Sequence, residues 1–498
     1  MELVSLDDSI IESAALSLCG ICLIALGVTN SSWCSTWNES FRCGVALLFP
    51  FLYGMDPALA FIFFVAVYQA ANYGGSITAI AINAPGTPAS VVTAIDGYEL
   101  TKQGLPGKAL GTAVFSSAFG GIVGAVVLIF AAQFIARFGL KFGPAEYFWL
   151  AVFGLSTVIA FGGTNWLKAL IGILIGLLLA TVGLDQFSGE PRYTFNIIDL
   201  FDGISFIPAM IGLFALAEIF SQIEAEQHHE IVDSKSFSNK LPSLTEIFNS
   251  FRTLVKSSFI GTFIGVIPGA GATIASFISY GEAKRSSKEP DKIGKGSLEG
   301  IVASEAANSS SVGGALVPLL ALGIPGSATD AVLLGALSLH GLAAGPELFN
   351  SNPDIAYGIF VSVFAANFFI LIFGLLGNSV WLKVISTPKA LLYTYVIAMC
   401  VLGSYTIRNS LFDSWICLGF GVVGWVLDKV GIKPAPIVLG LVLGPMIEIN
   451  FRRALLAGGY ELLYDSPLAI IIAGLTVLSC LFPLLKLCLF SMPKNPLP

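Results

Sequence analysis

The chain has 498 residues, of which 55% are hydrophobic and only 11% are charged, and its mean hydropathy is +0.83. Soluble domains carry roughly 25% charged residues, so this composition argues against a soluble enzyme and predicts a membrane protein. The net charge of -7 lies mostly in predicted loops. The sequence has no cluster of basic residues that would bind a nucleic acid, and its eight cysteines form neither a metal-binding nor a disulfide pattern.

Apolar runs long enough to cross the hydrocarbon core, about 20 residues each, recur along the chain, and they number roughly 11–12. We therefore expect an all-α polytopic membrane protein with re-entrant or broken helices and two inverted repeats. Helical spans are expected near 44–70, 109–135, 146–184 (two helices), 205–222, 355–380, 388–406, 411–429 and 467–490.

One long polar connector, from Glu224 to Asn249, divides the chain near its middle. Two halves of a repeated transporter would be joined there. We expect a first transmembrane repeat over 1–223, a polar cytoplasmic linker over 224–256 and a second repeat over 257–498.

Basic residues flank the apolar run Phe259–Tyr280 on both sides. Positively charged loops prefer the cytoplasm, so a single straight span would place one of these loops on the wrong side. The run also contains Pro268-Gly269-Ala270-Gly271. We therefore expect a helical hairpin that enters the membrane and returns to the same face. Such a backbone is tolerated only where protein buries it or where it lines a cavity.

Two similar Pro-Gly segments interrupt apolar runs, one in each half of the chain: Asn83–Pro88, the first break, and Gly323–Ala328, the second break. Proline and glycine are common in transmembrane helices, so one such segment is more often a simple bend. The matched pair instead predicts a transport site, because paired interrupted segments mark substrate sites in transporters. We expect Tyr73–Ile95 and Gly313–Leu339 to be broken elements.

Each break is followed by residues that suit a new helix start. Thr87 before Pro88 predicts an N-cap with proline at the first helical position, and Ser327 with Asp330 resembles a capping box. A helix N-terminus carries partial positive charge and free N–H donors, so it attracts anions. Backbone carbonyls of an unwound segment nearby can bind a cation. We expect such a sodium site near Gly75, Ser76, Gly314 and Asn308.

The polar segment Glu305–Ser311 leads into the second break. Asn308 and Ser310 are candidate ligands for substrate or sodium, and the alternative is a surface loop that enters a helix. Gly269–Thr273 superficially suggests a phosphate loop, but it lacks the Lys-Ser/Thr pair of a P-loop. No metalloprotease, serine-hydrolase or paired-aspartate motif is present, so we do not expect an enzyme.

A set of segments spread from about Leu47 to Ala469 is more specific than any single motif: Tyr73–Ile80, Asn83, Pro85–Ser90, Thr93–Tyr98, Pro268–Thr273, Ser279–Gly281, Gly294–Asn308, Ile324–Ser327, Leu333–Leu337 and Ala435–Pro445. In these segments the chain resembles the large membrane subunit of the tripartite tricarboxylate transporters, the TctA family.

The resemblance implies a multi-pass secondary transporter of the bacterial inner membrane that imports di- or tricarboxylates without ATP or another cofactor. A sodium or proton gradient would drive uptake. Its implied partners are a small four-helix membrane subunit and a periplasmic solute-binding protein. Substrate would lie between the breaks, and the expected binding residues are Asn83, Pro85, Gly86, Thr87, Asn308, Ser310, Pro325, Gly326 and Ser327.

The N-terminal segment departs from the family. Gly27–Cys34 and Trp37–Cys43 stand where members carry a Pro-Gly-Leu-Gly-like element. A carboxylate or ion channel and an intramembrane enzyme stay open as alternatives. The sequence leaves the substrate, the coupling ion and its stoichiometry, and the oligomeric state undecided.

Overall fold

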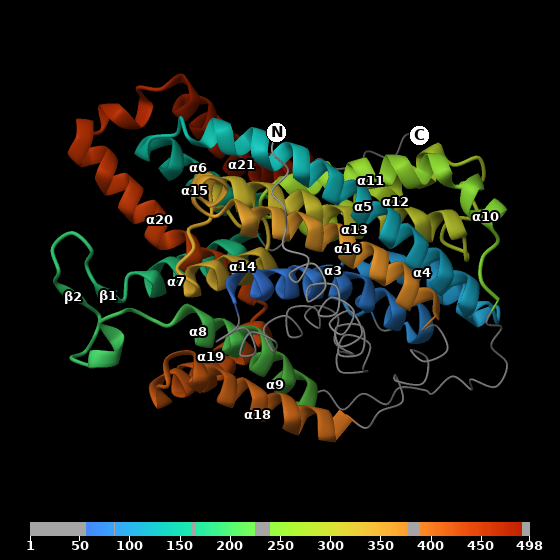
Figure 1. Ribbon diagram of the computed structural model, residues 1–498, viewed down its shortest axis with the longest axis horizontal. Coiled ribbons are helices and arrows are strands. Elements are labelled where there is room, and N and C mark those ends of the chain that lie inside the picture. Colours follow the sequence, from blue (N-terminus) through green and yellow to red (C-terminus); the bar gives the residue numbers. More distant parts are fainter. Residues whose placement is uncertain (1–55, 84, 162–165, 225–239, 377–388, 491–498) are drawn as a thin grey trace, which may run out of the picture.

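The computed structural model describes residues 56–83, 85–161, 166–224, 240–376 and 389–490. Regular structure in this part of the chain is almost all helical (Figure 1), apart from a two-residue antiparallel pair, β1 (Gly183–Leu184) and β2 (Pro191–Arg192). The expectations for the N-terminal segment and for most of the polar linker fall outside the described residues.

The helices of the first half are α3 (Pro57–Ile82), α4 (Ser90–Lys102), α5 (Pro106–Gly139), α6 (Pro144–Phe161), α7 (Trp166–Ala180), η2 (Ile198–Leu200), α8 (Phe206–Ile211), the π-helical η3 (Gly212–Leu216) and α9 (Ala217–Glu224). Those of the second half are α10 (Leu244–Asn249), α11 (Phe251–Val266), α12 (Gly271–Ser286), α13 (Leu298–Leu322), α14 (Ala328–Leu339), α15 (Pro346–Ser351), α16 (Pro353–Leu376), α18 (Lys389–Arg408), α19 (Leu411–Lys429), α20 (Pro434–Gly458), η5 (Glu461–Tyr464) and α21 (Pro467–Phe490).

Five of the described helices, α3, α5, α16, α19 and α20, are long and apolar enough to cross a membrane, and shorter apolar helices accompany them. The expected all-α membrane fold is thereby confirmed, while the repeat symmetry stays a prediction. The most apolar window is 83% buried in α3 but only 28% buried in α19. Helix α3 is therefore central to the bundle, whereas α19 lies at its periphery.

One expected span ends at the wrong residue, and one helix is missing from the expected spans. The first was expected to end at residue 70, but α3 continues to Ile82, because its polar second half is buried against other helices rather than exposed. The expected spans omitted α20, since three prolines and the charged residues near its end interrupt its apolar pattern.

Helix α13 packs closely against both α5 and α11. Small residues allow this approach. A Cβ atom at Gly124 of α5 would lie 2.6 Å from the Ser310 carbonyl oxygen, and one at Gly261 of α11 would lie 2.3 Å from that of Ala307. Both distances are too short for real atoms, so only glycine fits these helix contacts.

A helical hairpin is present as predicted in the pair α11 and α12, and its return to one face of the membrane stays a prediction. The chain reverses at Ile267–Ala270, the hairpin tip, where Gly269 adopts a φ of 78° that favours glycine. Lys256, near the start of α11, forms a 2.5 Å ion pair with Glu282, near the end of α12. The outer ends of the two helices therefore lie together.

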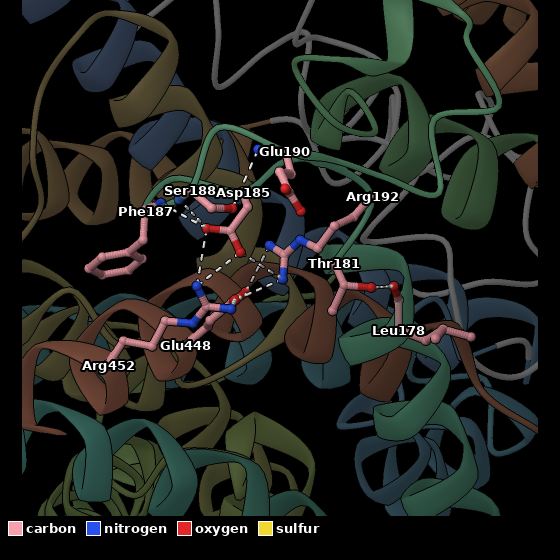
Figure 2. Close-up of polar contacts among 9 residues, drawn as sticks. All are labelled: Leu178, Thr181, Asp185, Phe187, Ser188, Glu190, Arg192, Glu448 and Arg452. Carbon is pink, nitrogen blue, oxygen red and sulfur yellow. Dashed lines mark hydrogen bonds and ion pairs between the residues drawn. The ribbon is translucent and has the colours of Figure 1, made fainter.

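The loop that carries β1 and β2 is fastened to α20 by charge pairs (Figure 2). Arg192 donates to both carboxylate oxygens of Glu448, at 2.8 and 3.2 Å. Arg452 lies 2.9 Å from Asp185 and 2.9 Å from Glu448. Asp185 also accepts from the backbone N–H groups of Phe187 and Ser188, at 2.8 and 3.0 Å. These contacts fix the loop against the end of α20.

Candidate functional site

The first break folds back onto the helix that precedes it. Helix α3 ends at Asn83, whose left-handed backbone (φ 53°, ψ 31°) turns the chain. Gly86 N–H then donates to the Gly75 carbonyl at 3.0 Å. Thr87 Oγ1 accepts from Ser90 N–H at 3.1 Å, and Ser90 Oγ accepts from Thr87 N–H at 3.1 Å. Thr87 therefore accepts from the N–H of the first residue of α4, but the expected N-cap is displaced, because the helix begins at Ser90 rather than at Pro88 and its N-cap position is Ala89.

The second break has the same construction. Helix α13 ends at Gly323, which has a φ of 72°. Helix α14 begins directly after its N-cap residue Ser327, whose Oγ accepts from Asp330 N–H at 3.2 Å. A Cβ atom at Gly326 would lie 3.5 Å from that of Ala315, so this break also folds back onto its preceding helix. The Gly326 carbonyl accepts from Gly269 N–H at 2.7 Å. The second break is thus joined to the hairpin tip.

Most of the predicted binding residues are withdrawn from the surface. Asn83 is the exposed exception, and its backbone rather than its side chain shapes the first break. Whether one substrate touches both breaks stays a prediction. Ser327 is half-buried, and the fully buried members of the predicted set are Pro85, Gly86, Thr87, Asn308, Ser310, Pro325 and Gly326.

The segment Glu305–Ser311 is a fully buried stretch of α13, so the surface-loop alternative is wrong. Asn308 and Asn72 of α3 bond reciprocally: Asn308 Nδ2 donates to the Asn72 carbonyl at 3.3 Å, and Asn72 Nδ2 donates to the Asn308 carbonyl at 3.5 Å. Within the described structure Asn308 Oδ1 has no partner. Ser310 Oγ bonds to the Ala307 carbonyl at 3.3 Å and faces Gly261, so it lies in a helix contact.

A polar layer that the sequence analysis missed continues from this amide pair. Gln69 Nε2 of α3 donates to Asn367 Oδ1 of α16 at 2.8 Å and to the Ser309 carbonyl at 3.4 Å. All three residues are at most 1% exposed. Gln69, Asn72 and Ser76 share one face of α3, because residues three, four or seven positions apart lie above one another. Polar residues at this spacing inside an apolar run are the sequence signal from which the polar layer could have been predicted.

The residues predicted to lie near sodium separate into different surroundings. Ser76 Oγ donates to Glu305 Oε1 at 2.6 Å. Gly75 lies under Thr87 in the first break, where a Cβ atom would be 2.6 Å from Thr87 Cγ2. Gly314 instead packs on α11, where a Cβ atom would be 2.2 Å from the Thr262 carbonyl oxygen. Of these positions, Ser76 is the one that contacts an acidic side chain.

Two cavities flank α14, and Leu334 lines both. One, of about 640 Å³, reaches Gly323 of the second break and includes Asn350, Asn450 and Arg453. The other, of about 680 Å³, lies between α14, α20 and the β1–β2 loop, with Arg192 in its lining. Both therefore adjoin the helix that the second break starts.

Sequence comparison identifies the family to which this chain is related. The family model for the tripartite tricarboxylate transporter TctA family matches residues 41–439. The chain is 37% identical over 412 residues, 83% of its length and 82% of the relative's, to an Agrobacterium vitis protein described as an uncharacterized 52.8 kDa protein in the TAR-I ttuC' 3' region. A second protein from the same organism, described as an uncharacterized protein in the TAR-II ttuC' 3' region, is 35% identical over 227 residues, 45% of this chain and 94% of its own.

No solved structure matches the chain significantly. The family match covers most of the sequence, including both breaks and the hairpin. The chain therefore belongs to the tripartite tricarboxylate transporter TctA family, and it is a multi-pass membrane subunit of such a transporter.

Proposed function

We propose that this chain imports di- or tricarboxylates across the bacterial inner membrane, driven by a sodium or proton gradient. A periplasmic solute-binding protein delivers the substrate, and a small four-helix membrane subunit completes the complex. The observation that carries this proposal is the pair of folded-back Pro-Gly breaks, each of which starts a new helix inside the bundle.

The electrostatics of the two helix starts suit an anion. The first N–H groups of a helix have no intrahelical acceptor, and its N-terminus carries roughly half a positive charge. Thr87 and Ser327 each satisfy one such donor. A substrate carboxylate accepts from the donors that remain after Gly86 and Gly326, although the buried carboxylate of Asp330 already lies beside Gly326 at the second break. Side-chain contacts come from Asn308 in addition to the two hydroxyl residues.

The cavity of about 640 Å³ supports a route to the second break. It reaches Gly323, and its lining includes Arg453, Asn350 and Asn450 together with one acidic residue, Glu347. Guanidinium and amide groups donate to carboxylates, so an anionic substrate gains favourable contacts on its way inward.

A channel and an intramembrane enzyme are the competing functions. A channel would equilibrate the carboxylate without a delivery protein, whereas a gradient-driven importer accumulates it and saturates. An enzyme would turn over substrate in detergent, where no gradient exists. Uptake that is saturable and dependent on the binding protein separates the importer from both.

Substitution of the two caps tests the site. Thr87→Val and Ser327→Val remove the hydroxyls while keeping similar volumes, and a lost cap costs about 1 kcal/mol, or roughly a fivefold change in binding, before any lost substrate contact. We expect gradient-driven uptake of radiolabelled carboxylate into vesicles to fall by at least that factor in each variant. Thr476→Val is the matched control, because Thr476 Oγ1 bonds within α21 to the Ile472 carbonyl. Wild-type uptake in both cap variants would refute the proposed site.

A further inference from the structure

We propose that Glu305 is the residue that binds the coupling cation of this transporter, a small monovalent cation that is either a proton or sodium. This inference rests on the proposed function, because it names the site through which the gradient acts. Glu305 lies on α13 and is fully buried, as are the side chains around it.

The carboxylate of Glu305 sits among hydroxyl groups from three other helices. Ser76 of α3 donates to Oε1 at 2.6 Å, Thr93 of α4 donates to the same oxygen, and Ser117 of α5 donates to Oε2 at 2.7 Å. Thr93 Oγ1 also lies 2.9 Å from Ser304 Oγ. Carboxylate and hydroxyl oxygens from four helices therefore converge on one point.

No ion pair joins Glu305 to a basic side chain in the part of the chain that the structure describes. A carboxylate buried without a counter-charge is costly, and it is stabilised by taking up a proton or by a bound cation. Ionisable side chains within the membrane mark ion pathways for this reason.

Of the other titratable groups on the elements that pack against α13, several are paired elsewhere, and Asp330 of α14 is fully buried beside Gly326 of the second break. Tyr73 of α3 is the one that faces Glu305. The remaining pairs are Asp96 with Tyr280, Lys256 with Glu282, Lys108 with Glu246, and Glu299 with Thr253 and Ser287.

Hydroxyl partners suit a group that changes its charge state. A hydroxyl both donates and accepts, so it serves a carboxylate as a donor and a carboxylic acid as an acceptor after rotation of one bond. The same oxygens are ligands for a hard cation. An N–H group can donate to a carboxylate, but it can neither accept from a carboxylic acid nor ligate a cation. The surroundings of Glu305 can thus stabilise its side chain both with and without a bound proton or sodium ion.

The position of the cluster links cation binding to the first break. Ser76 lies on α3 and Thr93 on α4, the two helices that the break joins. Glu305 lies on α13, which runs on into the second break. Loading Glu305 changes the hydrogen bonds that hold α3 and α4 to α13, so it acts on the geometry of the first break.

Infrared difference spectroscopy of the purified full-length chain tests this inference without any transport. We expect a buried carboxylic-acid carbonyl band that responds to pH, or to sodium at constant pH, and that is missing in Glu305→Gln. A response to pH alone identifies a proton, and a response to sodium identifies sodium. Glu289→Gln, which alters an exposed acid paired with Lys292, is the control and keeps the band. Identical spectra for wild type and Glu305→Gln in both arms would overturn the proposal.

Adjacent serines on α5 provide a second, milder test. Ser117 donates to Glu305, whereas Ser116 is equally buried and its Oγ has no partner in the described structure. A hydrogen bond to a charged group contributes enough that its loss changes an affinity roughly tenfold. We expect Ser117→Ala to shift the midpoint of the infrared band's response by about one pH unit, or by about tenfold in sodium concentration. Ser116→Ala should leave this midpoint unchanged. Equal midpoints in the two variants would contradict the assignment.

Transport assays distinguish a failure of this inference from a failure of the proposed function. In Glu305→Gln we expect gradient-driven accumulation to be lost while exchange of internal for external carboxylate persists, because exchange needs no net cation movement. Unchanged accumulation with unchanged ion dependence would refute the role of Glu305 and leave the importer intact. Absence of carboxylate movement in wild type would refute the importer and leave the infrared result standing.

Discussion

The first break depends on the absence of a side chain at Gly75. A Cβ atom there would lie 2.6 Å from Thr87 Cγ2, 2.9 Å from Thr87 N and 3.0 Å from Gly86 C. Two of these atoms belong to the backbone, so they cannot rotate away. Gly75→Ala must therefore push the break off α3 and lengthen the 3.0 Å hydrogen bond from Gly86 N–H to the Gly75 carbonyl.

The expected cost follows from overpacking, which destabilises a well-packed site by about 1–3 kcal/mol. That range corresponds to roughly 5- to 150-fold easier local opening. Hydrogen exchange followed by mass spectrometry should show this acceleration in a peptide that covers the first break, and uptake should fall in parallel.

Gly281→Ala is the matched control for this prediction. Gly281 lies in α12, and a Cβ atom there would meet nothing within 4 Å. An alanine at a helical glycine gains roughly 0.5–1 kcal/mol, so exchange and uptake should stay at wild-type values or improve slightly. If Gly75→Ala exchanged as slowly as Gly281→Ala, the contact between the break and α3 would not be what holds the break in place.

Two further predictions concern carboxylates that hold loops against helices. Asp96 Oδ1 accepts from the N–H groups of Gly294, Gly296 and Ser297 at 2.9, 2.8 and 2.7 Å, so Asp96→Ala should lower the free energy of unfolding by at least about 3 kcal/mol. The exposed neighbour Asp291→Ala should leave thermal unfolding unchanged, and equal melting temperatures would contradict the role of Asp96 in holding this loop. The N–H groups of Ser188 and Phe187, with Arg452, lower the pKa of Asp185 from 3.8 to about 2. The stability that Asp185 contributes is therefore fully present above pH 4 and lost as the pH falls through about 2. Proteolysis of the β1–β2 loop should rise in that window in wild type, and a wild-type pH profile in Asp185→Asn would show that another group is responsible.

The sequence allowed the fold class and the broken elements to be predicted, because proline, glycine and flanking charge act locally. The hairpin followed from basic residues on both sides of one apolar run, and Lys256 and Glu282 confirm it. The bonds from backbone N–H groups to the hydroxyls of Thr87 and Ser327 followed from short-range rules in the same way.

Partners brought together from distant parts of the chain could not be predicted. Glu305 was visible in a polar segment, but only the packing of α3, α4 and α5 around α13 shows that Ser76, Thr93 and Ser117 converge on it. The bond between Gly269 and Gly326 depends equally on tertiary structure. The full length of α3 was missed because burial against other helices compensates for its polar residues.

Carboxylate accumulation in proteoliposomes tests the account most directly. The vesicles would contain this chain and the proposed small membrane subunit, with the proposed binding protein and a panel of radiolabelled di- and tricarboxylates outside. Under an imposed sodium or proton gradient we predict saturable accumulation above the external concentration, dependent on the binding protein and abolished when the gradient is collapsed. Non-saturable equilibration of the carboxylate that is independent of both the sodium and the proton gradient would contradict this account.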